Sequence, residues 1–237
     1  MLPSYIIQEK KRSFLSEQRV KLNKEILDRF IVIQKQSKEI NRQTSCDFNM
    51  FRLFKIGETL HSYLLANILD PNSEHGQGNI FLHTFLKRVG IETPELGSWI
   101  VTAEKGRIDI LIKRKSPHSV VIIENKSNFA IDQPNQLYKY WHREIYIPNK
   151  DIDIDYSAQK RYRVVYLTPT HWKLPSEDTL MKPEGLPDLS PQRIPLEPVI
   201  WKFDEDISVW LSEALELVPD DNHRLREYLK QYIELWK

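Results

Sequence analysis

The first ninety residues place apolar side chains at the spacing of amphipathic helices. Within residues 15–40, apolar positions recur every three, four or seven residues among many charges, which predicts one amphipathic helix. A second helix is predicted over residues 51–69, where Asp70-Pro71 ends it, and a third over residues 79–89. We therefore expect the N-terminal part of the chain to be mostly helical.

A run of strands is predicted next, because the apolar pattern changes to period two or to continuous β-branched residues. Three short strands are expected over residues 99–102, 107–112 and 120–123. Asp132 is followed by Pro134, a pair that is typical of the first turn of a helix, so we predict that a helix begins there.

The C-terminal third mixes one long irregular stretch with further regular elements. Strands are predicted over residues 163–167 and 199–203, and closing amphipathic helices over residues 207–217 and 225–236. Residues 169–198 contain seven of the 14 prolines and little periodicity, so we expect an irregular excursion there rather than a second domain.

This order of elements predicts a single α/β domain over residues 47–237, with a mixed central sheet flanked by helices. Residues 1–46 would form a helical extension whose role the sequence leaves open. We favour a helix that lies across the domain over a dimerisation helix, because the apolar stripe spans too few heptads to require a coiled coil. A homodimer, or an interaction module built on this helix, stays an alternative.

Composition narrows the class of protein without identifying it. With 41% apolar and 28% charged residues the chain is typical of soluble globular proteins. Lys and Arg number 34 against 33 Asp and Glu, so any polyanionic partner must be bound by a local basic patch. The lone Cys46 allows no intrachain disulfide and no zinc site, which favours a cytoplasmic compartment. No apolar run reaches the roughly 18 residues of a membrane span, and the first residues are too polar for a signal peptide.

Candidate chemistry gathers at one end of a predicted hairpin. The polar break between the second and third strands is short and contains Pro117, so the two strands should pair antiparallel. If Arg114 pairs with Ser119, counting five residues back from Arg114 and five residues forward from Ser119 places Asp109 opposite Glu124. Lys126 follows two residues later and therefore lies on the same face as Glu124.

Two carboxylates that face each other across a ladder repel, so a cation between them is a better explanation than a structural role. Mg²⁺ takes one or two protein carboxylates together with water and phosphate oxygens. The ammonium of Lys126 cannot bind a metal, but it can orient a water molecule or offset negative charge on a phosphate. The alternative is an ordinary surface salt-bridge cluster, which we consider the weaker interpretation.

The surroundings of these residues resemble the PD-(D/E)XK nuclease superfamily, and most closely its bacterial members with an N-terminal segment of the form HS…LLDP…HGQG. The resemblance covers the chain from about Asp47 to the C-terminus. The matching motifs are Glu124-Asn125-Lys126 after an apolar strand, Gln136 and Tyr140 one helical turn apart, His61-Ser62, Leu69-Asp70-Pro71, His75-Gly76-Gln77-Gly78, Trp210-Leu211 and Gln231-Tyr232.

The resemblance implies a restriction-endonuclease-like αβββαβ core that binds Mg²⁺ or Mn²⁺ and hydrolyses phosphodiester bonds. Asp109 and Glu124 would be metal ligands, and the backbone carbonyl of Asn125 would be a further ligand. Lys126 would be the catalytic base or the group that orients the attacking water. One departure is that Ile108, and not a proline, precedes the aspartate.

The same resemblance implies supporting roles for other residues. Glu58 matches a glutamate on the first core helix that points at the metal in many members, although a carboxylate at a helix start also stabilises the helix dipole. Gln136 and Tyr140 would support the site or touch nucleic acid, and Arg107 could meet a phosphate. His61 could help at the site, but without further nitrogen or sulfur partners at regular spacing we favour a structural hydrogen bond.

We therefore expect a Mg²⁺-dependent nuclease that acts on DNA, with RNA as the less favoured substrate. The alternative is a member of the same fold that binds nucleic acid or protein without cutting. No glycine-rich phosphate loop is present, which argues against an ATP-driven enzyme. The sequence does not decide between endo and exo cleavage, and it gives no sequence preference, pathway or oligomeric state.

Overall fold

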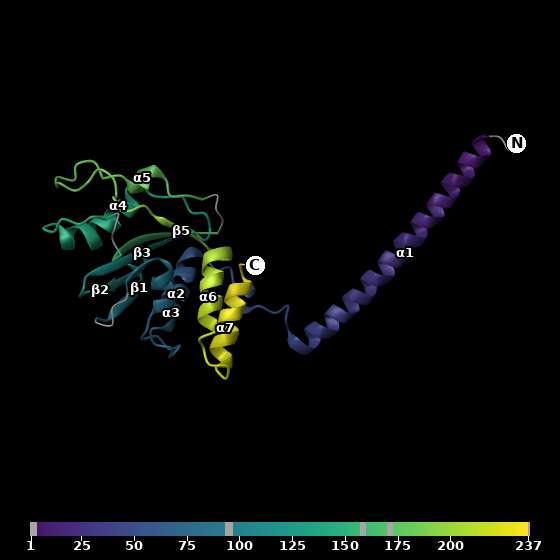
Figure 1. The fold of residues 1–237 in the computed structure, drawn as a ribbon, viewed down its shortest axis with the longest axis horizontal. Coiled ribbons are helices and arrows are strands. Elements are labelled where there is room, and N and C mark those ends of the chain that lie inside the picture. The colour runs from purple at the N-terminus through teal and green to yellow at the C-terminus, as the bar shows by residue number, and fades with distance from the viewer. Residues whose placement is uncertain (1–3, 93–96, 157–159, 170–172, 237) are drawn as a thin grey trace. The chain divides into compact units, whose positions relative to one another are not determined.

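The computed structural model of the chain describes residues 4–92, 97–156, 160–169 and 173–236 (Figure 1). The chain divides into two compact units, Met1–Asn49 and Met50–Lys237. The second unit contains the central sheet and every residue of the two hydrophobic clusters that form its core.

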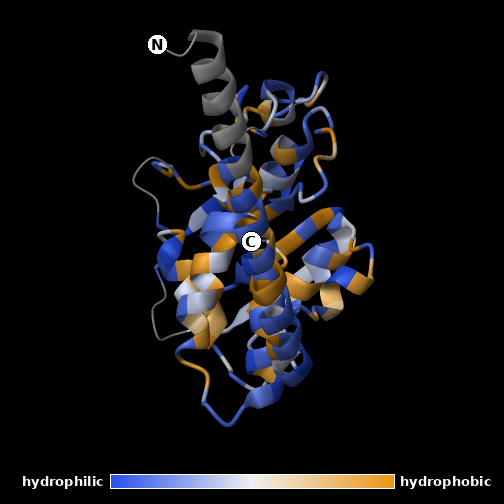
Figure 2. Cartoon of the chain, turned by 90° about the vertical axis from the view of Figure 1, so that its right-hand side faces the viewer, coloured by the Kyte–Doolittle hydropathy of each residue, from blue (hydrophilic) through white to orange (hydrophobic). Residues whose placement is uncertain are grey.

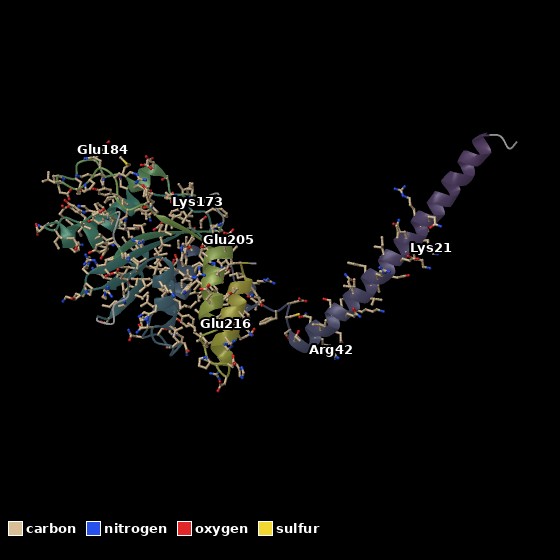
Figure 3. All side chains as sticks on the ribbon, in the orientation of Figure 1. Lys21, Arg42, Lys173, Glu184, Glu205 and Glu216 are labelled. Carbon is tan, nitrogen blue, oxygen red and sulfur yellow. The ribbon has the colours of Figure 1, made fainter. Side chains whose placement is uncertain are left out.

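Helix α1 (Ser4–Thr44) makes up most of the first unit and is 41 residues long. The helix predicted over residues 15–40 is therefore confirmed and longer at both ends. Among the residues of α1 that Figure 2 colours, both hydrophobic and hydrophilic ones occur, and Lys21 and Arg42 project from this helix (Figure 3). Its apolar residues Leu22, Ile26 and Phe30 are exposed.

The second unit is built on one five-stranded mixed sheet in the order β1-β2-β3-β4-β5. Strands β1 (Trp99–Lys105), β2 (Ile108–Arg114) and β3 (Ser119–Asn125) are antiparallel, whereas β4 (Tyr162–Thr168) and β5 (Val199–Lys202) continue the sheet in parallel. All seven residues of β3 are buried, because this central strand is covered on both faces. The predicted order of three strands, a helix and a further strand is confirmed.

Helices cover both sides of the sheet (Figure 1). On one side lie α2 (Glu58–Leu69), α3 (Ile80–Arg88), α6 (Ser208–Leu215) and α7 (His223–Glu234), which share a hydrophobic cluster with alternate residues of the strands. On the other side lie α4 (Gln136–Trp141) and the short α5 (Glu177–Leu180), which share a second cluster with the remaining strand residues. The α/β architecture is therefore a three-layer arrangement with the sheet in the middle.

Two predicted helix starts are wrong. The region predicted as one helix over residues 51–69 is a 3₁₀ turn (Met50–Leu53) and then α2, with Gly57 in extended conformation at the α2 N-cap. The helix expected from Asp132 begins only at Gln136, after Asn135 in left-handed conformation. Asp132 is therefore not a helix cap, and its carboxylate is used elsewhere.

The described residues of the excursion, 169 and 173–198, are irregular apart from α5 and an isolated bridge between Met181 and Arg193. It nevertheless adds to the core, because Leu180, Ile194 and Leu196 are buried in the cluster that contains α4. A π-helical turn (His142–Tyr146) and a 3₁₀ turn (Ile147–Asn149) extend α4, and a second π-helical turn (Phe203–Ile207) leads from β5 into α6. Among the described residues, no helix has the length and apolar character needed to cross a membrane.

We expect Ile123→Ala in β3 to lower the free energy of unfolding by about 2 to 5 kcal/mol, because it leaves a cavity in a close-packed core. The side chain of Ile123 is 1% exposed, whereas Ile100 in the edge strand β1 is 63% exposed. The matched variant Ile100→Ala should therefore change stability by less than about 0.5 kcal/mol. Urea unfolding of both variants measures the difference, and equal losses would contradict this assignment of centre and edge.

Candidate metal and catalytic site

The hairpin of β2 and β3 has the register that the sequence predicts. Arg114 pairs with Ser119, and Ile110 pairs with Ile123. One further step along both strands brings Asp109 to the position opposite Glu124. Oδ2 of Asp109 accepts a hydrogen bond of 2.6 Å from the backbone N–H of Asn125, which fixes this carboxylate beside the end of β3.

Burial and mutual repulsion make both carboxylates reluctant to ionise. Burial raises the pKa of Glu124 to about 8, and the negative charges of Asp109 and Asp132 act in the same direction. Burial also raises the pKa of Asp109 to about 6, against the lowering effect of the Asn125 N–H, and the charge of Glu104 adds to the rise. Oε2 of Glu124 is buried and has no hydrogen-bond partner in the part of the chain that is described. The pair therefore lacks a compensating positive charge on its open side.

Lys126 lies on the other side of Glu124. Its Nζ is 2.7 Å from Oε1 of Glu124 and 3.7 Å from Oδ1 of Asp132, and its side chain is only 6% exposed. Burial lowers the pKa of Lys126, but the charge and hydrogen bond of Glu124 and the charge of Asp132 outweigh this effect and raise it. Lys126 is therefore an ammonium group between two carboxylates.

Asp132 belongs to the site, and the sequence analysis missed it. Its Oδ1 accepts a hydrogen bond of 2.8 Å from the hydroxyl of Tyr166, and its Oδ2 accepts one of 2.8 Å from the N–H of Ser176. Lys173, labelled in Figure 3, lies with Nζ 4.0 Å from the same carboxylate. Tyr166 is paired with Glu124 in the parallel ladder of β3 and β4. A pairing between distant strands leaves no local signal in the sequence.

Glu58, the acidic residue at the start of α2, contacts the loop after β3. Oε1 of Glu58 accepts hydrogen bonds from the N–H groups of Asn128 at 2.9 Å and Ala130 at 3.2 Å. The side-chain amide of Asn125 donates to the carbonyl of Glu58 at 2.8 Å and to the hydroxyl of Ser62 at 3.1 Å. These bonds join the end of β3 to the first turn of α2. A metal role for Glu58 stays a prediction, as does the ligand role of the Asn125 carbonyl.

Gln136 and Tyr140 form a contact between α4 and the turn that precedes β2. Nε2 of Gln136 donates to the Tyr140 hydroxyl at 3.0 Å, and this hydroxyl donates in turn to the backbone carbonyl of Arg107. Burial raises the pKa of Tyr140 to about 12, and the charges of Glu124 and Asp109 contribute to the rise. Arg107 has a positive φ of 67° and an exposed side chain. The pair thus supports the strand that carries Asp109.

The family model of the PD-(D/E)XK nuclease superfamily matches residues 48–234. The chain belongs to the PD-(D/E)XK nuclease superfamily. Neither a curated protein nor a solved structure matches it. The matched range contains the entire sheet and all the residues of the site, so a nuclease-type function and a restriction-endonuclease-like fold follow for this part of the chain.

The donor set of this PD-(D/E)XK site fits a hard divalent cation. No group of three or more His, Cys, Asp or Glu side chains within the described ranges could hold a metal. Mg²⁺ needs no more than one or two carboxylates, because it keeps several waters and takes substrate phosphate oxygens. Asp109 and Glu124 supply two carboxylates, and the unpartnered Oε2 of Glu124 is the kind of buried acceptor that a cation would satisfy.

The structure places His61 among buried aromatic side chains of α7 and its surroundings. Its ring is 3% exposed, and its Nδ1 lies 3.0 Å from the hydroxyl of Tyr232 in α7. The ring also contacts Phe203 and Trp236. Burial lowers the pKa of His61 to about 4, so it stays neutral at physiological pH. The structural hydrogen bond that we favoured is present, and a role of His61 at the substrate stays a prediction.

We expect Asp109→Asn to stabilise the metal-free protein at about pH 8 and to change little at about pH 4. Because burial raises the pKa of Asp109 from 3.8 to about 6, the folded state binds this proton more tightly than the unfolded state. The protonated Asp109 of the wild type therefore contributes its full stability below the pKa of the unfolded state. This contribution is lost as the pH rises through the pKa of the folded state. A gain of about 1 to 3 kcal/mol at the higher pH follows from about 1.4 kcal/mol per pKa unit.

Urea unfolding in EDTA at both pH values measures this effect. Asp188→Asn is the control of opposite sign, because hydrogen bonds from Ser190, His142 and Lys182 hold the pKa of Asp188 below its usual range. That variant should lose stability at about pH 8. An Asp109→Asn protein that is less stable than wild type at this pH would show that the carboxylate is not destabilising.

Proposed function

We propose that this PD-(D/E)XK protein is a Mg²⁺-dependent nuclease that hydrolyses phosphodiester bonds of DNA. The observation that carries the proposal is the arrangement of Asp109, Glu124 and Lys126, in which a buried and unpartnered carboxylate oxygen faces a second carboxylate while the ammonium holds the opposite side. A purely structural cluster would satisfy this oxygen, because an unsatisfied buried acceptor costs stability. We take DNA as the substrate, and RNA is the alternative that the same experiment tests.

Asp109 and Glu124 would hold the divalent ion, with the carbonyl of Asn125 as a further ligand. Such an ion supplies a Lewis acid for the phosphate and lowers the pKa of water. Lys126 has the place and charge to orient water and to offset negative charge on the reacting phosphate. Its position is set by Asp132, which is itself held by Tyr166 and by the N–H of Ser176.

We expect Lys126→Ala to lose about 10² to 10⁴ in cleavage rate, because a positioned proton-transfer or charge-stabilising group contributes on that scale. The variant should still bind metal and nucleic acid, since both carboxylates remain. The measurement is single-turnover cleavage of a labelled DNA duplex and of a single-stranded oligonucleotide at saturating Mg²⁺. Binding of the same nucleic acids with Ca²⁺ serves as the reference for intact recognition.

Lys230→Ala on α7 is the matched control, because it removes an exposed lysine from the opposite side of the sheet. It should leave the rate unchanged within about twofold. A Lys126→Ala protein whose binding and cleavage fall by the same small factor would mean that Lys126 only touches phosphate. If the wild type binds nucleic acid but never cuts DNA or RNA, the nuclease proposal is wrong. The protein would then be a member of this fold that binds nucleic acid without cutting it.

A further inference from the structure

A pocket of about 580 Å³ lies on the sheet next to the candidate site. Its floor consists of Ile100 and Thr102 from β1 and Leu111 from β2, and its rim carries Lys105, Lys113 and Arg143. The pocket exists because α4 is short and packs over β3 and β4, where it shares a cluster with Val120, Ile122, Val164 and Tyr166. We call this hollow the β1–β2 pocket.

The pocket lies beside the site along β2, which contributes residues to both. Leu111 pairs with Ile122, two residues before Glu124, so Leu111 and Asp109 lie on the same face of β2 about 7 Å apart along the strand. Arg143 closes the other side, because its Nη1 donates to the carbonyl of Gly106 at 3.0 Å and its guanidinium is 5.9 Å from the ring of Tyr140. The hydroxyl of Tyr140 bonds to Arg107 beside the same turn. A nucleic-acid strand whose phosphate lies at Asp109 would therefore reach the pocket with its next nucleotide.

The charge of the pocket suits a polyanion. Glu144 holds two of the basic groups in place, with Lys113 at 3.0 Å and Arg143 at 2.7 Å, and Lys105 adds a third positive charge to this single carboxylate. Residues 101–150 contain nine Lys and Arg against five Asp and Glu, whereas residues 50–100 and 151–237 together contain 15 against 22. Positive charge in the second unit is thus concentrated in the segment that forms the pocket and the site, as phosphate binding requires.

The floor of the pocket suits a nucleobase and not a phosphate. Ile100 is 63% exposed on an edge strand, and with Leu111 it gives an apolar part to a pocket that Arg143 also lines with its planar guanidinium. Bases that leave the helical stack are bound by apolar surfaces and by arginine planes, whereas paired bases keep their faces stacked on one another. The volume is within the range of pockets that enclose small organic groups.

We propose that the β1–β2 pocket receives one unpaired nucleobase of the substrate strand while Lys105, Lys113 and Arg143 contact the neighbouring phosphates. This inference rests on the proposed nuclease function and adds the substrate class: single-stranded nucleic acid, or a duplex that is opened next to the cleaved bond. The pocket thus holds a base of the nucleic-acid strand that is cut.

The test measures binding with Ca²⁺ by fluorescence anisotropy, for a single-stranded oligonucleotide and for the duplex of the same sequence. Wild type should bind the single strand more tightly. A single abasic residue, moved along the oligonucleotide, should weaken binding about 5- to 100-fold at one position, because one stacked base contributes on that scale. In Ile100→Asp, which places a like charge beside the phosphates, overall binding should weaken at least about tenfold and the abasic effect should disappear.

Two matched controls separate this pocket from general charge effects. Val209→Asp changes an exposed apolar residue of α6, and Lys230→Glu changes a lysine in the basic pocket along α7. Both should leave binding within about twofold, whereas Lys105→Glu should weaken it and reduce its salt dependence by about one charge. Circular dichroism and metal titration confirm that each variant is folded and binds Mn²⁺.

The outcomes distinguish this inference from the proposed function. If wild type cuts nucleic acid but no abasic position matters and Ile100→Asp binds normally, the pocket inference is wrong and the nuclease proposal stands. If Lys105→Glu weakens binding and Ile100→Asp does not, the pocket is only a basic patch and the base-binding inference is also wrong. If wild type neither binds nor cuts any nucleic acid, both proposals fail.

Discussion

The repulsion between the buried carboxylate of Glu124 and the half-buried carboxylate of Asp109 is the constraint around which the second unit is organised. Asp109 lies near the start of β2 and Glu124 near the end of β3, so the two carboxylates share one end of the hairpin. Loss of solvation through burial raises the pKa of both. Their neighbours offset only part of this cost, through the ammonium of Lys126 and one backbone N–H. The remaining acceptor, Oε2 of Glu124, has no partner among the residues described. A protein keeps such a site at the expense of stability when an absent ligand completes it.

The surrounding elements hold this unfavourable arrangement in place by hydrogen bonds from every direction. The side chain of Asn125 and the carboxylate of Glu58 join β3 and its following loop to α2. On the other side of the sheet, Tyr140 joins α4 to the turn before β2. The carboxylate of Asp132 forms an ion pair with Lys126 and accepts hydrogen bonds from Tyr166 and from Ser176, which lies just before α5. Four segments distant in sequence, namely α2, α4, β4 and the stretch before α5, therefore meet at the start of β2 and the end of β3. Their contacts explain how a short hairpin keeps two like charges together.

The part of this site that could be predicted from sequence is the part set by a short turn. The polar break after Arg114 fixes the register of β2 and β3, and with it the meeting of Asp109, Glu124 and Lys126. Asp132 was assigned to a helix cap because Asp followed by Pro has that meaning locally, whereas its partners Tyr166 and Ser176 come from a parallel strand and a distant loop. The break before α2 was missed for a related reason: the apolar spacing continues across Gly57, although the backbone is extended there.

We propose that Asp109 and the unpartnered Oε2 of Glu124, whose charge Lys126 offsets only in part, together hold a divalent cation. The most direct measurement is the anomalous difference map of a crystal soaked in Mn²⁺. We expect a peak that bridges the carboxylates of Asp109 and Glu124, with Oε2 of Glu124 as a ligand. Crystals of Glu124→Gln should show no bridging peak. A map without a peak between these two carboxylates, or the same peak in Glu124→Gln, would contradict it.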